Sequence, residues 1–289
     1  MFIKFEDVSF QYNAGTQMAQ RVLHDIDFSI AKASFSCIIG HTGSGKSTLM
    51  QHLNALLLPS NGTVTVPGGV IGAGTKIKPK AIKKIRQHVG LVFQFPEYQL
   101  FETTVLKDIM FGPKNYGKSN EEAEKLARHA AKIVGLDEAL LEKSPFELSG
   151  GFRRRVAIAG ILAMDPEVVV LDEPTAGLDP RGRAEILDIF ANLQKQGKTI
   201  IVATHDMDLV AKYASHVIVM CEGRKLLEGK PIEVFTQHEA IKKAGIYLPT
   251  AASIYAQAFG YDESLPLTLD DFILKMVERK SKREDETQS

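Results

Sequence analysis

The sequence has few of the features that mark secreted or membrane-spanning proteins. It contains no tryptophan and two cysteines, Cys37 and Cys221, each within a short apolar run. Two such cysteines cannot make a disulfide framework, so we expect both to be buried, reduced thiols. The longest apolar runs, residues 156–164 and 168–171, fall well short of the roughly 18 residues that a membrane-spanning helix needs.

The chain also lacks an excess of charge of either sign. Lys plus Arg and Asp plus Glu are both 35, so the formal net charge is zero. We therefore expect no nucleic-acid partner that is held by bulk positive charge. Residues 1–6 alternate polar and apolar side chains, which is not typical of a signal peptide. The length of 289 residues allows a sizeable core.

Short apolar runs alternate with helical patterns over most of the chain. Strands are expected within residues 2–36 and at 34–39, 62–70, 89–93, 168–171, 199–204 and 216–221, and helices at 46–57, 105–111, 121–134, 151–164, 181–196 and 207–213. This alternation predicts a parallel sheet that is covered on both faces. The helical block at about 95–165 is expected to be an insertion between two halves of one α/β core.

The character of the sequence changes again after about residue 230. An apolar stripe with helical spacing consists of Leu269, Phe272, Ile273, Met276 and Val277. Thr268 and Asp271 supply a helix-capping signal just before it. The stripe needs cover, either from the chain's own body or from a partner, and the pattern leaves both open. The charged tail from about residue 280 is expected to be disordered.

A glycine-rich segment between a predicted strand and a predicted helix fits the phosphate-binding pattern G-x-x-x-x-G-K-[ST]. Its residues are Gly40, His41, Thr42, Gly43, Ser44, Gly45, Lys46, Ser47 and Thr48. Glycines let consecutive amides converge on an anion, and the next helix adds its free N–H groups. Lys46 is expected at the β- and γ-phosphates and Ser47 at Mg²⁺, so ATP and Mg²⁺ are the predicted cofactors.

Two carboxylates follow the buried strand at 168–171. Ligands of a parallel sheet lie at the carboxyl ends of its strands, which is also where the phosphate-binding segment lies. Asp172 is then expected to hold Mg²⁺, and Glu173 to polarise the attacking water. Alone, this pattern equally fits a solvated acidic turn; its pairing with the phosphate-binding segment favours the catalytic interpretation.

Ser149, Gly150 and Gly151 open a basic helix and form a second candidate anion site. Together with the phosphate-binding segment they resemble the signature motif of ABC ATPases, a likeness that covers residues 1 to about 230. It implies a P-loop NTPase core with an antiparallel β subdomain, an inserted helical subdomain and, at 231–289, a small α-helical extension. In this family two domains pack head to tail, so the signature of one closes over the ATP of the other.

The resemblance implies further roles, residue by residue. Tyr12 resembles the aromatic that stacks on adenine; the less favoured alternative is an exposed tyrosine at a strand end. Gln94 resembles the glutamine that links nucleotide and metal to the transporter, Asp179 lies in a segment similar to the D-loop, and His205 resembles the histidine that senses the γ-phosphate. The family usually has Gln after the two signature glycines, whereas this chain has Phe152.

Residues 93–102 are rich in aromatics and resemble the corresponding segment of energy-coupling factor (ECF) transporter ATPases, as does 154–160. The alternative is an aromatic cluster that packs within the helical block. The likeness implies an ATPase, of the second (A-prime) type, that energises import of vitamins or transition-metal ions. Its implied partners are a second ATPase in a heterodimer, paired partly through the C-terminal extension, a transmembrane coupling subunit and interchangeable substrate-binding membrane subunits.

On this interpretation the chain is a peripheral protein at the cytoplasmic face of the cell membrane. Two alternatives remain. The chain could be the ABC ATPase of another importer class, or a soluble ATP-switched regulatory protein that binds a partner and moves nothing. The transported substrate does not follow from the sequence, because other chains recognise it in this architecture.

Overall fold

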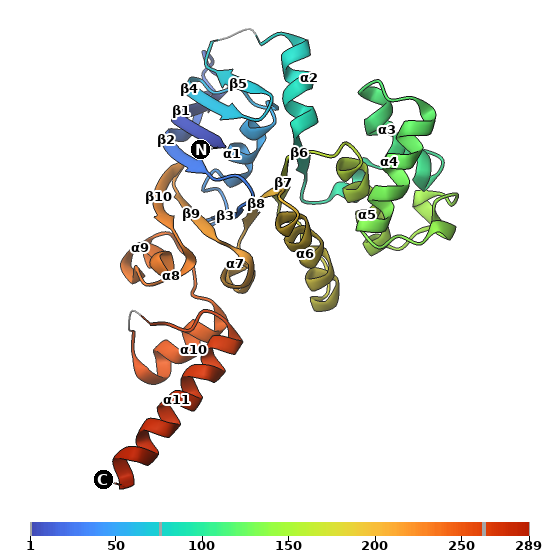
Figure 1. Ribbon diagram of the computed structural model, residues 1–289. Coiled ribbons are helices and arrows are strands. Elements are labelled where there is room, and N and C mark those ends of the chain that lie inside the picture. The colour runs from blue at the N-terminus through green and yellow to red at the C-terminus, as the bar shows by residue number, and fades with distance from the viewer. Residues whose placement is uncertain (1, 75–76, 262–263, 289) are drawn as a thin grey trace.

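The computed structural model describes residues 2–74, 77–261 and 264–288, and two sheets form the body of this part of the chain (Figure 1). The larger sheet has the strand order β10-β9-β3-β8-β7-β6. Its strands are β3 (Phe35–Ile39), β6 (Val89–Val92), β7 (Val168–Asp172), β8 (Thr199–Thr204), β9 (His216–Cys221) and β10 (Arg224–Gly229). All neighbours pair in parallel except β9 and β10, so the predicted parallel sheet is confirmed.

The smaller sheet is antiparallel and has the order β2-β1-β4-β5. Its strands are β1 (Ile3–Tyr12), β2 (Gln20–Ile30), β4 (Asn61–Val66) and β5 (Gly69–Gly72). In the sequence, helix α1 (Lys46–Leu53) follows β3 of the larger sheet and precedes β4 of the smaller one. It buries Leu49, Met50 and Leu53. This is the antiparallel β subdomain that the family resemblance implied.

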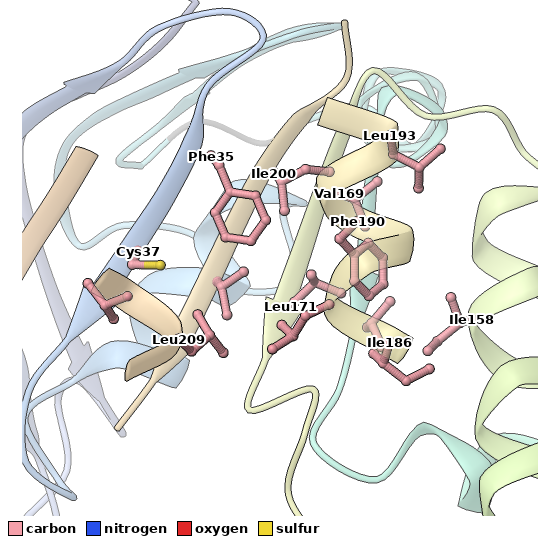
Figure 2. Close-up of a cluster of buried hydrophobic side chains, with 14 of the residues drawn as sticks. Phe35, Cys37, Ile158, Val169, Leu171, Ile186, Phe190, Leu193, Ile200 and Leu209 are labelled. Carbon is pink, nitrogen blue, oxygen red and sulfur yellow. The ribbon is translucent and has the colours of Figure 1, made fainter. Parts of the chain in front are cut away.

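The central strands are buried on both faces, which explains their continuous apolar sequences. In β7, Val169 and Leu171 face one apolar cluster, while Val168 and Val170 face another. The first cluster also contains Phe190 from α6 (Pro180–Lys195) and Leu209 from α7 (Met207–Tyr213), and Figure 2 shows these side chains packed against the sheet. The other face packs on α1 and the smaller sheet.

The helical insertion lies between the neighbouring strands β6 and β7 and stands to one side of the sheets (Figure 1). Its elements are η1 (Pro96–Gln99), α3 (Val105–Asn115), α4 (Asn120–Ile133), η2 (Glu138–Leu140), η3 (Pro145–Glu147) and α5 (Gly150–Leu162). Local signals fix its helix starts: Thr104 caps α3, and Ser119 and Glu122 form a capping box on α4.

Three local differences from the sequence prediction have physical reasons. Helix α1 ends at Leu53 rather than at 57, because Ala55 adopts a left-handed conformation with φ of 56°. Helix α2 (Pro79–His88) was not predicted, because its core-facing side consists of Ile82 and Ile85 alone, which is too short a stripe to recognise. Strand β10 was not predicted either, because it is an edge strand whose side chains are half-buried or exposed.

The extension consists of α8 (Pro231–Phe235), α9 (His238–Lys243), α10 (Thr250–Phe259) and α11 (Leu269–Gln288), and the last of these projects away from the body (Figure 1). Thr268 and Asp271 cap α11 as predicted. The predicted disorder from about residue 280 does not match the structure, in which α11 continues to Gln288. The charged residues there are good helix formers, so the same composition favours a helix.

The apolar stripe of α11 is divided between two environments. Phe272 and Met276 pack against the main core, whereas Leu269, Ile273 and Val277 are 51–67% exposed. The chain's own body therefore covers one half of the stripe, among the residues that the structure describes. In that same part of the chain, every helix is too short or too polar to cross a membrane.

Candidate nucleotide site

The phosphate-binding segment forms a loop between the end of β3 and the start of α1, as predicted. Gly43 and Gly45 have φ of 84° and 99°, in the left-handed region that glycine adopts at little cost. Gly45 directly precedes α1, so the loop leads into a helix N-terminus with free N–H groups. The backbone thus has the form that an anion nest requires.

Close contacts leave no space for a side chain at Gly40, the first residue of this loop. A Cβ added to Gly40 would lie 2.3 Å from the carbonyl oxygen of Met220 and 2.6 Å from the Ser44 hydroxyl. The Ser44 hydroxyl is itself buried and has no hydrogen-bond partner among the described residues. A tight glycine cradle with an unsatisfied polar group fits a triphosphate.

Lys46 lies in the loop's interior rather than in solvent. Its Nζ donates to the carbonyl oxygens of Gly40 at 2.8 Å and His41 at 3.0 Å. Burial lowers the pKa of Lys46, and the nearby carboxylates of Glu173 and Asp172 oppose that shift. The ammonium group is therefore held at the loop by weak carbonyl acceptors, which a more strongly charged acceptor can replace.

Asp172 and Ser47 meet across the sheet edge. Burial raises the pKa of Asp172, while a hydrogen bond with Ser47 and the charge of Lys46 act in the opposite direction. One carboxylate, one hydroxyl and a lysine do not form an all-protein metal cage. They fit a cation such as Mg²⁺, which keeps several waters and takes its remaining ligands from phosphates.

Glu173 has an unusual backbone and a defined partner. Its φ is 48°, a conformation that is rare outside glycine, and its amide donates to the carbonyl oxygen of Ala203 at 2.9 Å. The carboxylate Oε1 lies 2.8 Å from Nδ1 of His205, whose side chain is 76% exposed while that of Glu173 is 14% exposed. The structure thus brings these two predicted catalytic residues together.

The structure places Tyr12 and Gln94 at the rim of this site. The Tyr12 hydroxyl lies 3.3 Å from the Thr48 hydroxyl, and its ring packs edge-on against Phe10. Gln94 is exposed, two residues after the end of β6, and β6 pairs with β7, which ends at Asp172. Both predicted residues therefore lie at the same end of the fold as the phosphate loop.

The second predicted anion site lies apart from the first. Ser149 is exposed and caps the start of α5, but its hydroxyl makes no capping hydrogen bond. A hollow of about 730 Å³ adjoins it and is lined by Gly135, Ser149, Gly151, Phe152, Arg155, Gly177, Leu178, Asp179, Arg181, Gly182, Glu185 and Ile186. None of these residues belongs to the phosphate loop. Asp179 also has a structural task, since its carboxylate caps α6 by accepting from the Gly182 amide at 2.6 Å.

The sequence did not reveal what supports the phosphate loop from behind. The turn between β9 and β10 donates from the Gly223 amide to the Ser44 carbonyl oxygen at 3.1 Å. A Cβ on Gly245, just after α9, would lie 3.8 Å from the Cβ of His41. These supports come from about 180 and 200 residues further along the chain, so no local pattern could have indicated them.

Fold and motifs together define an ABC-type ATPase. The family model for ABC transporters matches residues 23–176, more than half of the chain. The energy-coupling factor transporter ATP-binding protein EcfA2 of Enterococcus faecalis is 52% identical over 284 residues, which cover 96% of this chain and 97% of that protein. EcfA2 of Bacillus cereus is 50% identical, with 96% of both chains covered. The chain therefore belongs to the ABC transporter ATP-binding family, in its energy-coupling factor branch.

Solved structures agree with this assignment. CbiO1 from Clostridium perfringens, described as part of the ABC transporter complex cbiONQ, aligns with a TM-score of 0.72 and 42% identity over 84% of this chain and 93% of that one. The ATP-binding cassette MJ0796, solved as a dimer in a post-hydrolysis state with ADP and Pi, aligns with a TM-score of 0.70 and 29% identity over 80% and 99%. The predicted fold class is thus confirmed.

Proposed function

We propose that the chain binds Mg-ATP at the phosphate loop, hydrolyses it within a pair of ATPase subunits, and thereby energises an importer of the energy-coupling factor type. One observation carries this proposal: Lys46, Asp172 and the Glu173–His205 pair meet at one sheet edge. The chain's relatives at 50–52% identity carry the energy-coupling factor name, which favours this function over another importer class or a soluble regulator.

Each residue of the phosphate site has a task that its surroundings support. The amides of residues 40–48 bind phosphate oxygens, and Lys46 exchanges its carbonyl acceptors for the β- and γ-phosphates. Ser47, Asp172 and Gln94 would hold Mg²⁺, which would neutralise charge that develops on the transferred phosphoryl group. Tyr12 lies beside α1, where adenine can stack on its ring.

Glu173 orients the attacking water and accepts its proton. His205, 2.8 Å from that carboxylate, holds the side chain in position and contacts the γ-phosphate. Glu173 has a left-handed backbone with φ of 48°, and its carboxylate contacts His205. Because His205 contacts both this carboxylate and the γ-phosphate in the proposal, hydrolysis becomes sensitive to the presence of that phosphate.

The second ATPase subunit completes each site. Ser149, Gly150 and Gly151 are exposed at the N-terminus of α5, and no phosphate-loop residue of the same chain lines the hollow beside them. In a head-to-tail pair they bind the γ-phosphate of ATP held by the partner, with Asp179 at the same surface. We expect the partner to be a different ATPase, and the exposed half of the α11 stripe to contribute to that pairing.

The membrane partner contacts an aromatic surface that we define as Phe95, Tyr98, Phe101 and Phe111. These side chains are all exposed: Phe95 is 42% exposed, Tyr98 83%, Phe101 56% and Phe111 47%. Phe101 and Phe111 pack edge to face, with ring centroids 4.9 Å apart. Exposed apolar groups in such number mark a contact surface. We propose that it receives a transmembrane coupling subunit at the cytoplasmic face, which in turn joins interchangeable subunits that recognise vitamins or metal ions.

Affinity purification from detergent-solubilised membranes tests this function. The wild-type chain should retain polytopic membrane subunits and a second ATPase. Replacing Phe95 and Tyr98 by Ala should weaken the binding of membrane subunits about 30-fold or more, since two lost apolar anchors each contribute on the order of 1–2 kcal/mol. Binding of a fluorescent ATP analogue should not change. Replacing exposed Met18 by Ala is the control, and full recovery of the membrane subunits with the double variant would refute the coupling role of this surface.

A further inference from the structure

A buried arginine connects the aromatic surface to the segment that follows Glu173. Arg154 lies in the first turns of α5, and its side chain is 4% exposed. Its Nε donates to Oε2 of Glu97 at 3.1 Å, and its Nη2 donates to Oε1 of Glu97 at 2.8 Å. The guanidinium therefore binds the Glu97 carboxylate in a bidentate manner.

The same guanidinium also binds the turn at residues 174–176. Nη1 donates to the carbonyl oxygen of Ala176 at 2.6 Å and lies 3.4 Å from that of Pro174. Ala176 is three residues after Glu173, and the Ala176 amide donates to the Glu173 carbonyl oxygen at 3.1 Å. One planar group thus links Glu97 to the turn that begins at the predicted catalytic carboxylate.

Glu97 itself belongs to the aromatic surface by position. It lies in η1 between Phe95 and Tyr98, but its side chain is mostly buried, at 13% exposed. The Phe95 ring centroid is 5.9 Å from the guanidinium carbon of Arg154. A partner protein that contacts Phe95 and Tyr98 therefore contacts the same segment whose Glu97 side chain is bonded to Arg154.

The physical chemistry of this contact favours a positioning task over a stabilising one. A buried ion pair gives little net stability, because desolvation of both charges offsets their attraction. A guanidinium with five donors in a rigid plane instead fixes the relative position of the groups that it bonds. Here those groups come from two parts of the chain, η1 and the turn at 174–176, and Arg154 itself lies in a third, α5.

We propose that Arg154 is a positioning residue that holds the turn after Glu173 in register with the aromatic surface. Movement of η1 then shifts the Ala176 carbonyl and, through it, the backbone of Glu173 and the residues leading to Asp179. Since Arg154 is also part of the helix that the signature motif opens, all three move as one unit. That the moving body is a membrane subunit rests on the function proposed above; the link itself does not.

The link can be tested in the purified full-length chain without a membrane partner. We expect Glu97→Gln to raise amide hydrogen exchange at residues 174–179 by about 5-fold or more, the lower range of typical coupling between sites. Glu97 is bonded to this turn only through Arg154 among the described contacts, so a local effect at η1 would not reach it. Arg154→Lys, which keeps the charge but loses the fork, should raise the same exchange. Unchanged exchange at 174–179 in both variants would overturn the proposal.

The control is an Arg–Glu pair in the same subdomain. Arg128 in α4 donates from Nε and Nη2 to Oε1 of Glu124 at 2.9 and 2.7 Å, and neither residue contacts η1 or the turn at 174–176 in the structure. Glu124→Gln should leave exchange at 174–179 unchanged. If Glu124→Gln raised it as much as Glu97→Gln, the effect would be general loosening of the helical subdomain, and the positioning role would be refuted.

A second measurement uses the assembled transporter. Glu97→Gln should keep membrane subunits bound but lower the ratio of substrate taken up to ATP hydrolysed by about 5-fold or more. A purely structural role would lower the thermal midpoint and the hydrolysis rate while leaving that ratio unchanged, and this result would overturn the proposal. Failure of the wild-type chain to retain any membrane subunit would refute the proposed function instead, while the exchange experiment would still decide the link.

Discussion

The chain contains two helix N-termini suited to phosphate, and they differ in how much of each site the chain itself supplies. At the start of α1, an added Cβ on Gly40 would meet the Met220 carbonyl at 2.3 Å, and Ser44 is fully buried. At the start of α5, an added Cβ on Gly150 or Gly151 would meet nothing within 4 Å. The first site is preorganised by the chain's own backbone, whereas the second is an open surface that needs another body to complete it.

The largest expected effect is on ATP turnover and comes from changing Glu173, the predicted catalytic carboxylate. Glu173→Gln should lower ATP turnover at least about 100-fold, because a positioned general base typically contributes 10²–10⁴. ATP affinity should remain, since the amide keeps the side-chain volume. With ATP bound, the variant pair should remain a closed dimer in which the start of α5 in each chain contacts the partner's nucleotide. Size-exclusion chromatography in the presence of ATP would detect this dimer.

Glu167 supplies the matched control for that experiment. It lies just before β7, at the end opposite Glu173, and its carboxylate Oε1 lies 2.7 Å from Nδ1 of His88. Glu167→Gln removes a similar Glu–His contact far from the phosphate loop. Normal turnover by Glu173→Gln, or an equal loss in both variants, would contradict the catalytic assignment.

The contrast between the two glycine-rich starts can be measured directly. Gly40→Ala should weaken binding of a fluorescent ATP analogue about 10- to 100-fold, since relief of a clash with fixed backbone costs on the order of 1–3 kcal/mol. Gly151→Ala should leave this affinity within about twofold but stop turnover of the pair, because its methyl group would occupy the space for the partner's nucleotide. Similar losses of affinity in both variants would show that the two sites are not divided in this way.

The built site also depends on a histidine beneath it. His52 of α1 is fully buried, its Nδ1 lies 2.7 Å from the Thr48 carbonyl oxygen, and burial lowers its pKa to about 4. Between about pH 6.5 and pH 4, His52 is protonated in the unfolded chain but stays neutral in the folded chain. The free energy of unfolding therefore falls as the pH falls through this range. At pH 5 the loss from this group is about 2 kcal/mol.

Denaturant unfolding at pH 7.5 and pH 5 tests this dependence. His52→Gln can still donate to the Thr48 carbonyl and does not titrate, so the variant should lose about 2 kcal/mol less than the wild type between the two pH values. An identical pH dependence in both proteins would show that His52 is not held neutral by its surroundings.

The smallest expected effect concerns the open site. Phe152 is 42% exposed at the hollow beside Ser149, at the position where the family resemblance led us to expect Gln. Phe152→Gln should leave ATP affinity unchanged and alter turnover of the pair about 2- to 10-fold, the range of one interfacial hydrogen bond. Phe152→Leu is the apolar control. An unchanged rate in Phe152→Gln would mean that this position takes no part in the shared site.

The sequence predicted those features that arise within a short stretch of chain. The phosphate loop, the strand that ends at Asp172 and the α11 cap are each encoded within nine residues, so residue type and spacing were sufficient. The roles of Glu173 and His205 were each predicted, but the contact between them was not, although both residues follow strands that end at the same sheet edge. The fold class was predicted because continuous apolar strands alternate with helical patterns.

Other features depend on contacts between distant segments, and no local pattern reports them. The bond from Gly223 to Ser44 and the grip of Arg154 on Glu97 and Ala176 join residues that are 22 to 179 positions apart. The division of the α11 stripe into a covered and an exposed half could not be predicted either, since all its members are apolar. Helix α2 was missed because two isoleucines, Ile82 and Ile85, make up its core-facing side.

The backbone of Glu173 has a consequence for any effort to make this protein more robust. A non-glycine residue in the left-handed region costs about 1–2 kcal/mol, and φ at Glu173 is 48°. Selection for thermal tolerance alone would favour Gly or Asn there, and the resulting protein would be sturdier but unable to turn over its nucleotide. Part of the molecule's stability is thus given up at the one position where the direction of a single carboxylate matters most.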